Sequence, residues 1–305
     1  MARGRLLALG ALGAGLIAAP VVFQMFSRAP KGADMIVEFG PYMTDEVITR
    51  FVSDLELIDA ALDEYRADVA PRLDPSVRTT YVGRFDQEWP VIHDDMGGML
   101  TTMGEDVPRF EGVEALPSFE LFPWFFVLPG ALLLFAAIAG LRSPRGRWPL
   151  GVAVVIGVGL VAAPVVFQMF SRAPEGARMI DDFRPFMTVE KVQSIQGYFL
   201  VIGAGEGNVR NDVLPAVGDD VEAPLLRQFS EQWPRISNDM APMIGAMSDN
   251  IDNYEAVDAL PSFALFPWFF VAPGVLAAAL GIMELRRRGL GIGDSTNELE
   301  ISTQT

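Results

Sequence analysis

The chain repeats itself at one fixed interval. Residues 18–30, which read AAPVVFQMFSRAP, return without change at 162–174, 144 positions later. The same interval relates Trp89 to Trp233, and the run FPWFFV also recurs at it. Self-similarity at a fixed period constrains the architecture before any local feature is considered. We therefore interpret the chain as a tandem duplication with no net insertion between these landmarks.

The composition indicates a membrane protein. Half of the 305 residues are hydrophobic and the mean hydropathy is +0.29, both high for a soluble protein. The first apolar stretch could be a cleaved signal peptide, but its repetition inside the chain favours a retained anchor. Four stretches have about the ~20 residues that a transmembrane helix needs, at 6–26, 121–141, 150–170 and 265–283.

Basic residues predict how these spans are oriented. Cytoplasmic flanks of membrane proteins are enriched in Lys and Arg. We therefore place residues 1–5, 142–149 and 284–305 in the cytoplasm, the last as a disordered tail, and residues 27–118 and 171–262 outside. The expected location is a plasma membrane of bacterial type. The arginines on the predicted inner side are Arg3, Arg5, Arg142, Arg145, Arg147, Arg286, Arg287 and Arg288.

The two long outer segments are acidic. Residues 27–118 hold 19 Asp and Glu against 8 Lys and Arg, and residues 171–262 hold 15 against 7. This charge could serve solubility and avoidance of anionic headgroups, or it could attract cationic ligands. The net charge of −16 excludes a nucleic-acid partner, because phosphate backbones need a basic face.

Both outer segments have the periodicity of helices. A cap at Thr44 is followed by apolar residues at alternating spacings of three and four, and the second copy keeps the stripe with Glu206 in one slot. So narrow a stripe must be buried against a partner helix. We predict an all-α protein with four spans and two extracytoplasmic helical bundles in pseudo-two-fold arrangement. The first stripe is Ile48, Phe51, Leu55, Ile58, Leu62, Tyr65 and Val69.

A methionine stripe repeats in both outer segments. Methionines at helical spacing are most often core residues, but they could also line a pliable groove for an apolar ligand or partner, and thioethers can bind Cu(I). We keep the groove as the candidate site. Its residues are Met96, Met99, Met103, Met240, Met243 and Met247.

Aromatic and amide residues mark the outer ends of the spans. Trp124, Phe125, Trp268 and Phe269 are expected to anchor the chain at the membrane interface, where aromatic belts occur. Gln24 and Gln168 are the notable polar groups in the spans, and we expect them to bond between helices near the two-fold axis.

The residues for common catalytic chemistry are missing. The chain has no cysteine and one histidine, His93, whose counterpart is Ser237. Zinc and transition-metal sites of the usual kind cannot be built, and His93 is better explained as a surface residue than as a base. We predict no catalytic residue, cofactor or metal.

These observations favour a non-enzymatic integral membrane protein. Its paired acidic domains would bind a membrane-protein partner or a membrane lipid, in a scaffold or accessory role. Two alternatives stay open. One is a transport component, either a passive pore or an accessory to a pump, although the spans have no central ionisable residue. The other is an extracytoplasmic sensor that signals through a separate partner.

Overall fold

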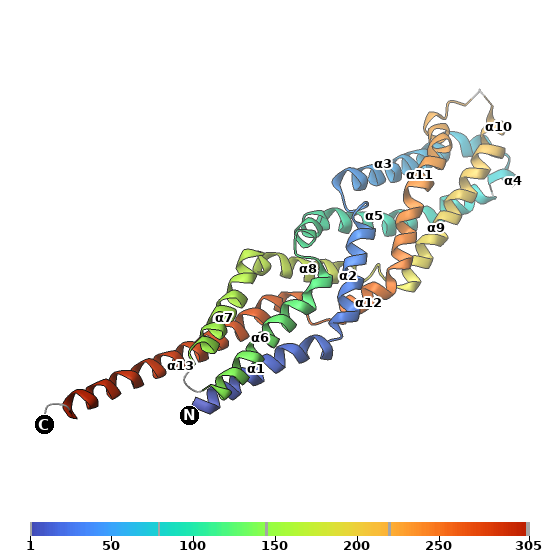
Figure 1. Ribbon diagram of the computed structural model, residues 1–305. Helices are drawn as coiled ribbons and strands as arrows, with labels where there is room; N and C mark the ends of the chain where they lie inside the picture. Colours follow the sequence, from blue (N-terminus) through green and yellow to red (C-terminus); the bar gives the residue numbers. More distant parts are fainter. Residues whose placement is uncertain (1, 79, 144–145, 219–220, 303–305) are drawn as a thin grey trace. The chain divides into compact units, whose positions relative to one another are not determined.

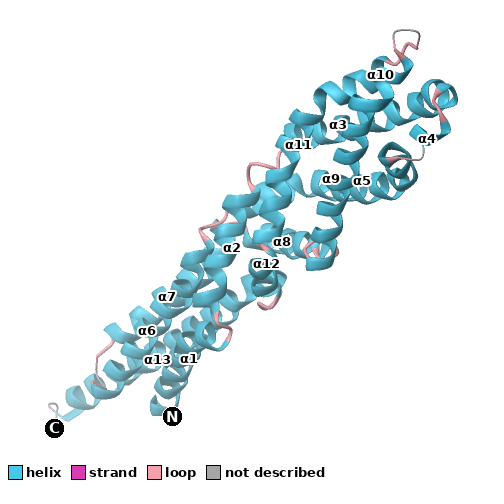
Figure 2. Ribbon diagram, turned by 90° about the vertical axis from the view of Figure 1, so that its right-hand side faces the viewer, coloured by secondary structure: helices cyan, strands magenta, loops and turns pink. Residues whose placement is uncertain are grey.

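The computed structural model describes residues 2–78, 80–143, 146–218 and 221–302, and every regular element in them is helical. Figure 2 shows these helices joined by loops, without a strand. The expected all-α class is confirmed for this part of the chain. The helices (Figure 1) are α1 Ala2–Val22, α2 Met25–Phe39, α3 Asp45–Glu64, α4 Pro75–Arg78, α5 Tyr81–Glu114, α6 Phe122–Arg142, α7 Trp148–Val166, α8 Met169–Phe183, α9 Val189–Asn208, α10 Leu214–Val217, α11 Pro224–Asp249, α12 Ile251–Asp258 and α13 Phe266–Ser302.

Helices α2 and α3 of the first half begin and end at positions equivalent to the bounds of α8 and α9 in the second half. Both α3 and α9 have 20 residues, and their bounds are 144 positions apart. The side chain of Thr44 accepts a hydrogen bond from the Val47 N–H at 3.3 Å, and Thr188 accepts one from Lys191 at 3.2 Å. The predicted cap at Thr44 is therefore confirmed. A difference follows later, because α5 is continuous where its counterpart breaks at Asn250 into α11 and α12.

The chain divides into two compact units, and each takes residues from both halves of the sequence. Unit 1 contains residues 1–33, 112–178 and 256–305, and unit 2 contains residues 34–111 and 179–255. The sequence predicted separate helical domains for the two long segments. Instead, both segments contribute to one unit with a common hydrophobic core. The reason is that α3 packs against α11 from the other half, so neither stripe is buried within its own segment alone.

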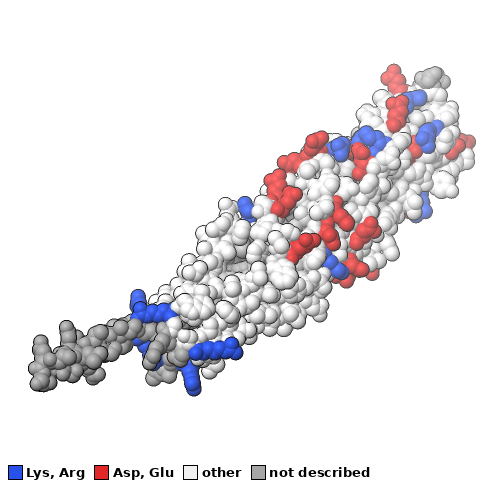
Figure 3. Space-filling model, in the orientation of Figure 1, with Lys and Arg blue, Asp and Glu red and all other residues white. Residues whose placement is uncertain are grey.

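Unit 1 contains four helical segments that are long and apolar enough to cross a membrane. They agree with the four expected spans and indicate an integral membrane protein. Within the unit α1 packs along α6, and α7 packs along α13 (Figure 1). Their exposed side chains are largely uncharged, as the white surface between the charged groups in Figure 3 illustrates. The segments are Arg3–Val22, Phe119–Arg142, Trp148–Val166 and Phe263–Arg287.

Glycines allow these helix pairs to approach closely. A Cβ on Gly13 would lie 2.6 Å from the carbonyl oxygen of Gly130, so no larger residue fits there without moving the backbone. Gly157 has the same relation to Gly274, also at 2.6 Å. Small residues at such crossings let helix backbones touch in a membrane. The first and third spans are therefore closely packed, each against the span that follows it in the sequence.

The first and third spans end earlier than expected. We predicted ends at 26 and 170, but α1 ends at Val22 and α7 at Val166. Gln24 and Gln168 both have φ of 54°, in the left-handed region that costs a residue with a Cβ atom steric strain. This conformation ends one helix and lets the next begin at once. The exact repeat 18–30 therefore spans a helix end, a break and a helix start.

The C-terminal segment differs from its prediction. Residues 284–305 were expected to be disordered, but α13 continues to Ser302, and the last three residues lie outside the described chain. Adding residues to an existing helix is much easier than nucleating a new one. Leu, Arg and Glu, which favour helices, occur repeatedly in this stretch and offset its three glycines.

The predicted apolar stripe forms the core of unit 2. Its seven residues in α3 and the turn that follows are each 6 % exposed or less. Phe85 and Phe229, which are 144 positions apart, meet in this core with ring centres 6.1 Å apart. Equivalent side chains thus contact each other where the two halves join.

Candidate functional site

The six predicted groove methionines are buried. Each is between 1 and 3 % exposed and belongs to the core of unit 2. They offer no surface to a ligand in this conformation. The core interpretation explains the stripe, because the residues face the neighbouring helices of the unit and close its interior.

The four aromatic anchors lie at the start of α6 and α13. Trp124 and Trp268 are 48 and 57 % exposed. Each also contacts an aromatic ring at the start of another helix: Phe26 of α2 lies 5.7 Å from Trp124, and Phe170 of α8 lies 5.8 Å from Trp268, between ring centres. Phe125 and Phe269 are half-buried beside them.

Gln24 and Gln168 do not bond between helices. Both side chains are exposed, and within the described residues neither amide group bridges to another helix. Their contribution comes from the backbone, whose left-handed turn was described above. The backbone carbonyl of each glutamine accepts a hydrogen bond from a serine hydroxyl: Gln24 from Ser27 at 3.0 Å, and Gln168 from Ser171 at 2.9 Å. The sequence identified the right residues but not their structural role.

The described residues contain no group of three or more metal-ligating side chains. His93 is half-buried, with its ring 5.5 Å from that of Trp89. It packs as an aromatic neighbour in unit 2. No nucleophile, base and acid are brought together around it in the interactions that the structure records.

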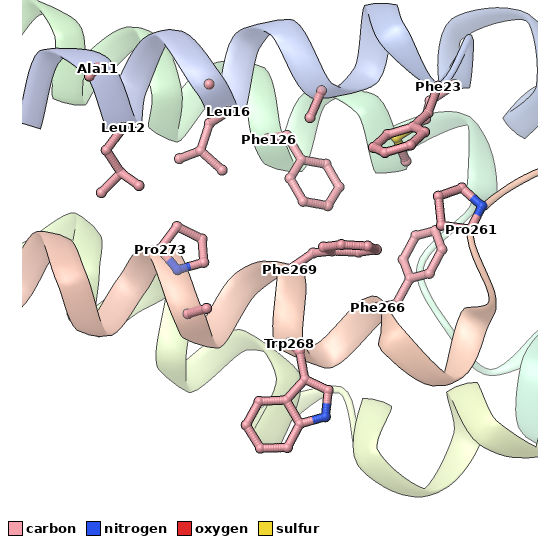
Figure 4. Close-up of a pocket in the computed structure, with 14 residues that line it drawn as sticks. Ala11, Leu12, Leu16, Phe23, Phe126, Pro261, Phe266, Trp268, Phe269 and Pro273 are labelled. Atoms are coloured by element: carbon pink, nitrogen blue, oxygen red, sulfur yellow. The ribbon is translucent and has the colours of Figure 1, made fainter.

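An apolar cavity of about 320 Å³ lies within unit 1 between α1 and α13. Figure 4 shows Leu12 and Leu16 of α1 across an open space from Pro273 and Phe269 of α13. The volume is near the lower end of ~300–1,000 Å³ for small-molecule sites. All of its lining residues are apolar, so it fits hydrocarbon. The rings of Phe23 and Phe266 lie together at one end of the space.

An arginine lies near one end of this cavity. Met25 and Pro261 line the cavity. Arg28, three residues after Met25, donates from Nη1 to the carbonyl oxygen of Ala259, two residues before Pro261, at 2.8 Å. Arg172 donates in the same way to Ala115 at 3.1 Å. Each arginine caps the end of a helix from the other half, which satisfies a carbonyl left free there.

In unit 1, three ring pairs join residues that are 144 positions apart. Phe119 contacts Phe263 with ring centres 5.5 Å apart, Phe122 contacts Phe266 at 5.5 Å, and Phe126 contacts Phe270 at 4.7 Å. Self-contact of equivalent side chains is what a two-fold axis requires. Phe126 and Phe266 also line the cavity, so this aromatic column forms its wall.

Polar contacts in unit 2 join the two halves. Asp95 accepts from Lys191 at 2.7 Å and from the Tyr198 hydroxyl at 2.5 Å. The hydrogen bonds from Lys191 and Tyr198 lower the pKa of Asp95, and the bond to Asp95 raises the pKa of Tyr198 to about 12. Arg235 binds Asp54 through both terminal nitrogens, at 2.5 and 3.2 Å. Because each pair is satisfied, these groups hold the unit together.

Sequence reasoning missed both the cavity and the arginine beside it. Arg28 and Arg172 lie in the unchanged repeat, which was the available signal that they have a shared role. No sequence pattern marks the cavity, because its lining looks like any other apolar span. No protein-family model matches the chain, and no curated protein is significantly similar to it.

Proposed function

We propose that this protein is a non-enzymatic integral membrane protein that binds a membrane component, either a lipid or the apolar part of another membrane protein. The observation that carries the proposal is the apolar cavity between α1 and α13. A hydrocarbon-lined space at the depth of the spans can accept a chain from the membrane but not a polar substrate. The acidic unit 2 then serves as the surface that a partner protein meets.

The topology in this proposal is a tandem duplication with both termini in the cytoplasm and unit 2 outside. The unchanged repeat, the equivalent helix bounds and the three ring pairs all support duplication around a pseudo-two-fold axis. Contacts of Arg5 with Glu284, at 3.5 Å, and of Leu6 with Gly140 gather the arginine-rich helix ends on one side of unit 1. The positive-inside pattern makes that side cytoplasmic. Packing of α1 against α6 favours a retained first span.

The test is purification of the full chain in mild detergent, with mass spectrometry of the lipids and proteins that accompany it. The key variant is Gly15→Leu. Gly15 lines the cavity, and a Cβ there meets nothing within 4 Å, so the larger side chain fills the space without a clash. Gly159 is equally open at the equivalent position, which makes Gly159→Leu the matched control.

We expect the natural protein and Gly159→Leu to carry a stoichiometric apolar ligand or partner that Gly15→Leu loses. Both substitutions replace glycine in a helix and so favour folding. Equal binding by the two variants would remove the cavity from the proposal. A natural protein that carries neither lipid nor partner would contradict the binding function itself.

A transport role has less support. The residues that line the cavity are all of apolar type, and ion or solute pathways through membranes need polar or charged linings. Solute flux through the protein alone in reconstituted vesicles would reverse this ranking.

A further inference from the structure

The charges nearest the outer end of the α1–α13 cavity differ from those at the equivalent surface between α6 and α7. Beside the cavity, α2 carries Arg28 and, three positions on, Lys31. In the other half Arg172 is kept, but Lys31 is replaced by Glu175. The cavity end is thus more positive than its counterpart.

A second position changes in the same direction. Ala264 lies in the short helical turn between two lining residues of the cavity, Pro261 and Phe266. Its counterpart 144 positions earlier is an exposed acid, Glu120. At positions 28, 31 and 264, the cavity end therefore has two basic groups and no acid. The equivalent positions 172, 175 and 120 have one basic group and two acids.

The next charged position along the helices reduces this difference but does not reverse it. Asp34 stands one turn farther along α2, and its counterpart is Arg178. Arg178 is paired with Glu175, with Nη1 and Oε1 2.9 Å apart. The nearest groups, which an interfacial ligand would meet first, keep their opposite character.

We propose that the cavity holds one acyl chain of an anionic phospholipid, whose phosphate lies against Arg28 with Lys31 nearby. This inference rests on the proposed function and names its ligand class. Arg28 uses one of the five donors of its guanidinium on the Ala259 carbonyl, which leaves further N–H groups for a phosphate. The apolar lining takes the chain, and the excess of positive charge selects the headgroup. The equivalent surface in the other half has Glu175 and Glu120 in place of Lys31 and Ala264, and so attracts an anion less.

The experiment uses the full chain in nanodiscs that contain equal amounts of phosphatidylglycerol and phosphatidylcholine with the same acyl chains. Bound lipids are counted by native mass spectrometry after transfer to mild detergent. We expect one retained phosphatidylglycerol per chain. Arg28→Gln should lower its retention about fivefold, the equivalent of ~1 kcal/mol per basic residue near a charged headgroup.

Arg172→Gln is the matched control, because it loses the same kind of bond to a helix-end carbonyl and should retain the lipid. Lys31→Glu, which installs the residue already present at position 175, should also lower retention. Equal retention in the Arg28 and Arg172 variants would overturn the inference.

The lipid preference separates the two proposals. If Gly15→Leu displaces a lipid that shows no headgroup preference, the anionic site is wrong and the binding function stands. If neither lipid is retained and no partner accompanies the natural protein, both proposals fail.

Discussion

The two halves of unit 2 share their long helices but differ in where they place the acid that pairs with an arginine. In the first half, Leu62 is in the core and Asp86 accepts from Arg66 Nε at 2.5 Å. In the second half, the position of Leu62 holds Glu206, which is 2 % exposed. Ser230, the counterpart of Asp86, donates to Glu206 at 2.7 Å.

The arginine that balances the acid is kept in both halves. Arg210, the counterpart of Arg66, has Nε 3.6 Å from the Glu206 carboxylate. The carboxylate that pairs with this arginine therefore comes from α5 in the first half and from α9 in the second, whereas the arginine has the same position in both halves. A buried charge is tolerated when it is paired and hydrogen-bonded. The comparison teaches that the halves have diverged through compensated exchanges.

Each half also caps a helix of the other. The Glu64 carboxylate accepts from the Leu226 N–H near the start of α11 at 2.8 Å. Its counterpart, Asn208, accepts from the Val82 N–H near the start of α5 at 3.1 Å. Acceptors at helix starts satisfy N–H groups that have no partner within the helix. Divergence is therefore limited where one half supports the other.

The largest effect on stability is expected when only one of the two residues in this exchange is changed to its second-half counterpart. Leu62→Glu should destabilise unit 2 by about 3–5 kcal/mol, because it buries a carboxylate beside an arginine already bound to Asp86. Adding Asp86→Ser reproduces the second-half arrangement and should recover part of the loss. Thermal unfolding of the full chain in detergent measures both. A double variant no more stable than the single one would contradict the compensated exchange.

A smaller effect is expected where the halves differ by one methyl group. Ala61 is buried in the first half, and its counterpart is Gly205. A Cβ on Gly205 would lie 2.5 Å from Cδ1 of Phe85, which is fully buried. Gly205→Ala should therefore destabilise the protein by about 1–3 kcal/mol, as overpacking does. The same thermal measurement applies, and Phe85→Leu should relieve the effect. An unchanged melting temperature in Gly205→Ala would show that the ring can move.

The smallest effect is on how the stability of the folded protein depends on pH. Asp106 is fully buried and its counterpart is Asn250. Burial raises the pKa of Asp106, although Arg109 opposes this with a hydrogen bond at 2.5 Å. Since the folded protein holds the proton more tightly, its stability falls as the pH rises from the ordinary Asp range through the raised pKa. Asp106→Asn should remove this loss.

We expect Asp106→Asn to stabilise the protein at pH 7 by about 1 kcal/mol, within the usual range for one substitution. The gain should vanish below the ordinary pKa of aspartate. Melting temperatures of both proteins between pH 3 and about 7 measure it. A destabilised variant at pH 7 would mean that the ion pair with Arg109 outweighs burial.

Patterns confined to one helix could be predicted from the sequence. The stripe from Ile48 to Val69, the cap at Thr44 and the four spans depend on spacing and on local hydrogen bonds, so the structure agrees with them. The candidate site could not be found in this way. The methionine groove followed a pattern that core packing also produces, and the cavity depends on how far α1 lies from α13.

The sequence by itself determined that the chain is helical, apolar enough for four spans, and repeated at an interval of 144 residues. These properties follow from the order of residue types along the chain. Only the tertiary structure decided that both long segments share one core, that Gln24 turns left-handed and that Arg28 lies beside an apolar cavity. The reason is that a stripe or a charge specifies that a helix needs a partner. Which helix becomes that partner depends on packing between residues far apart in the sequence.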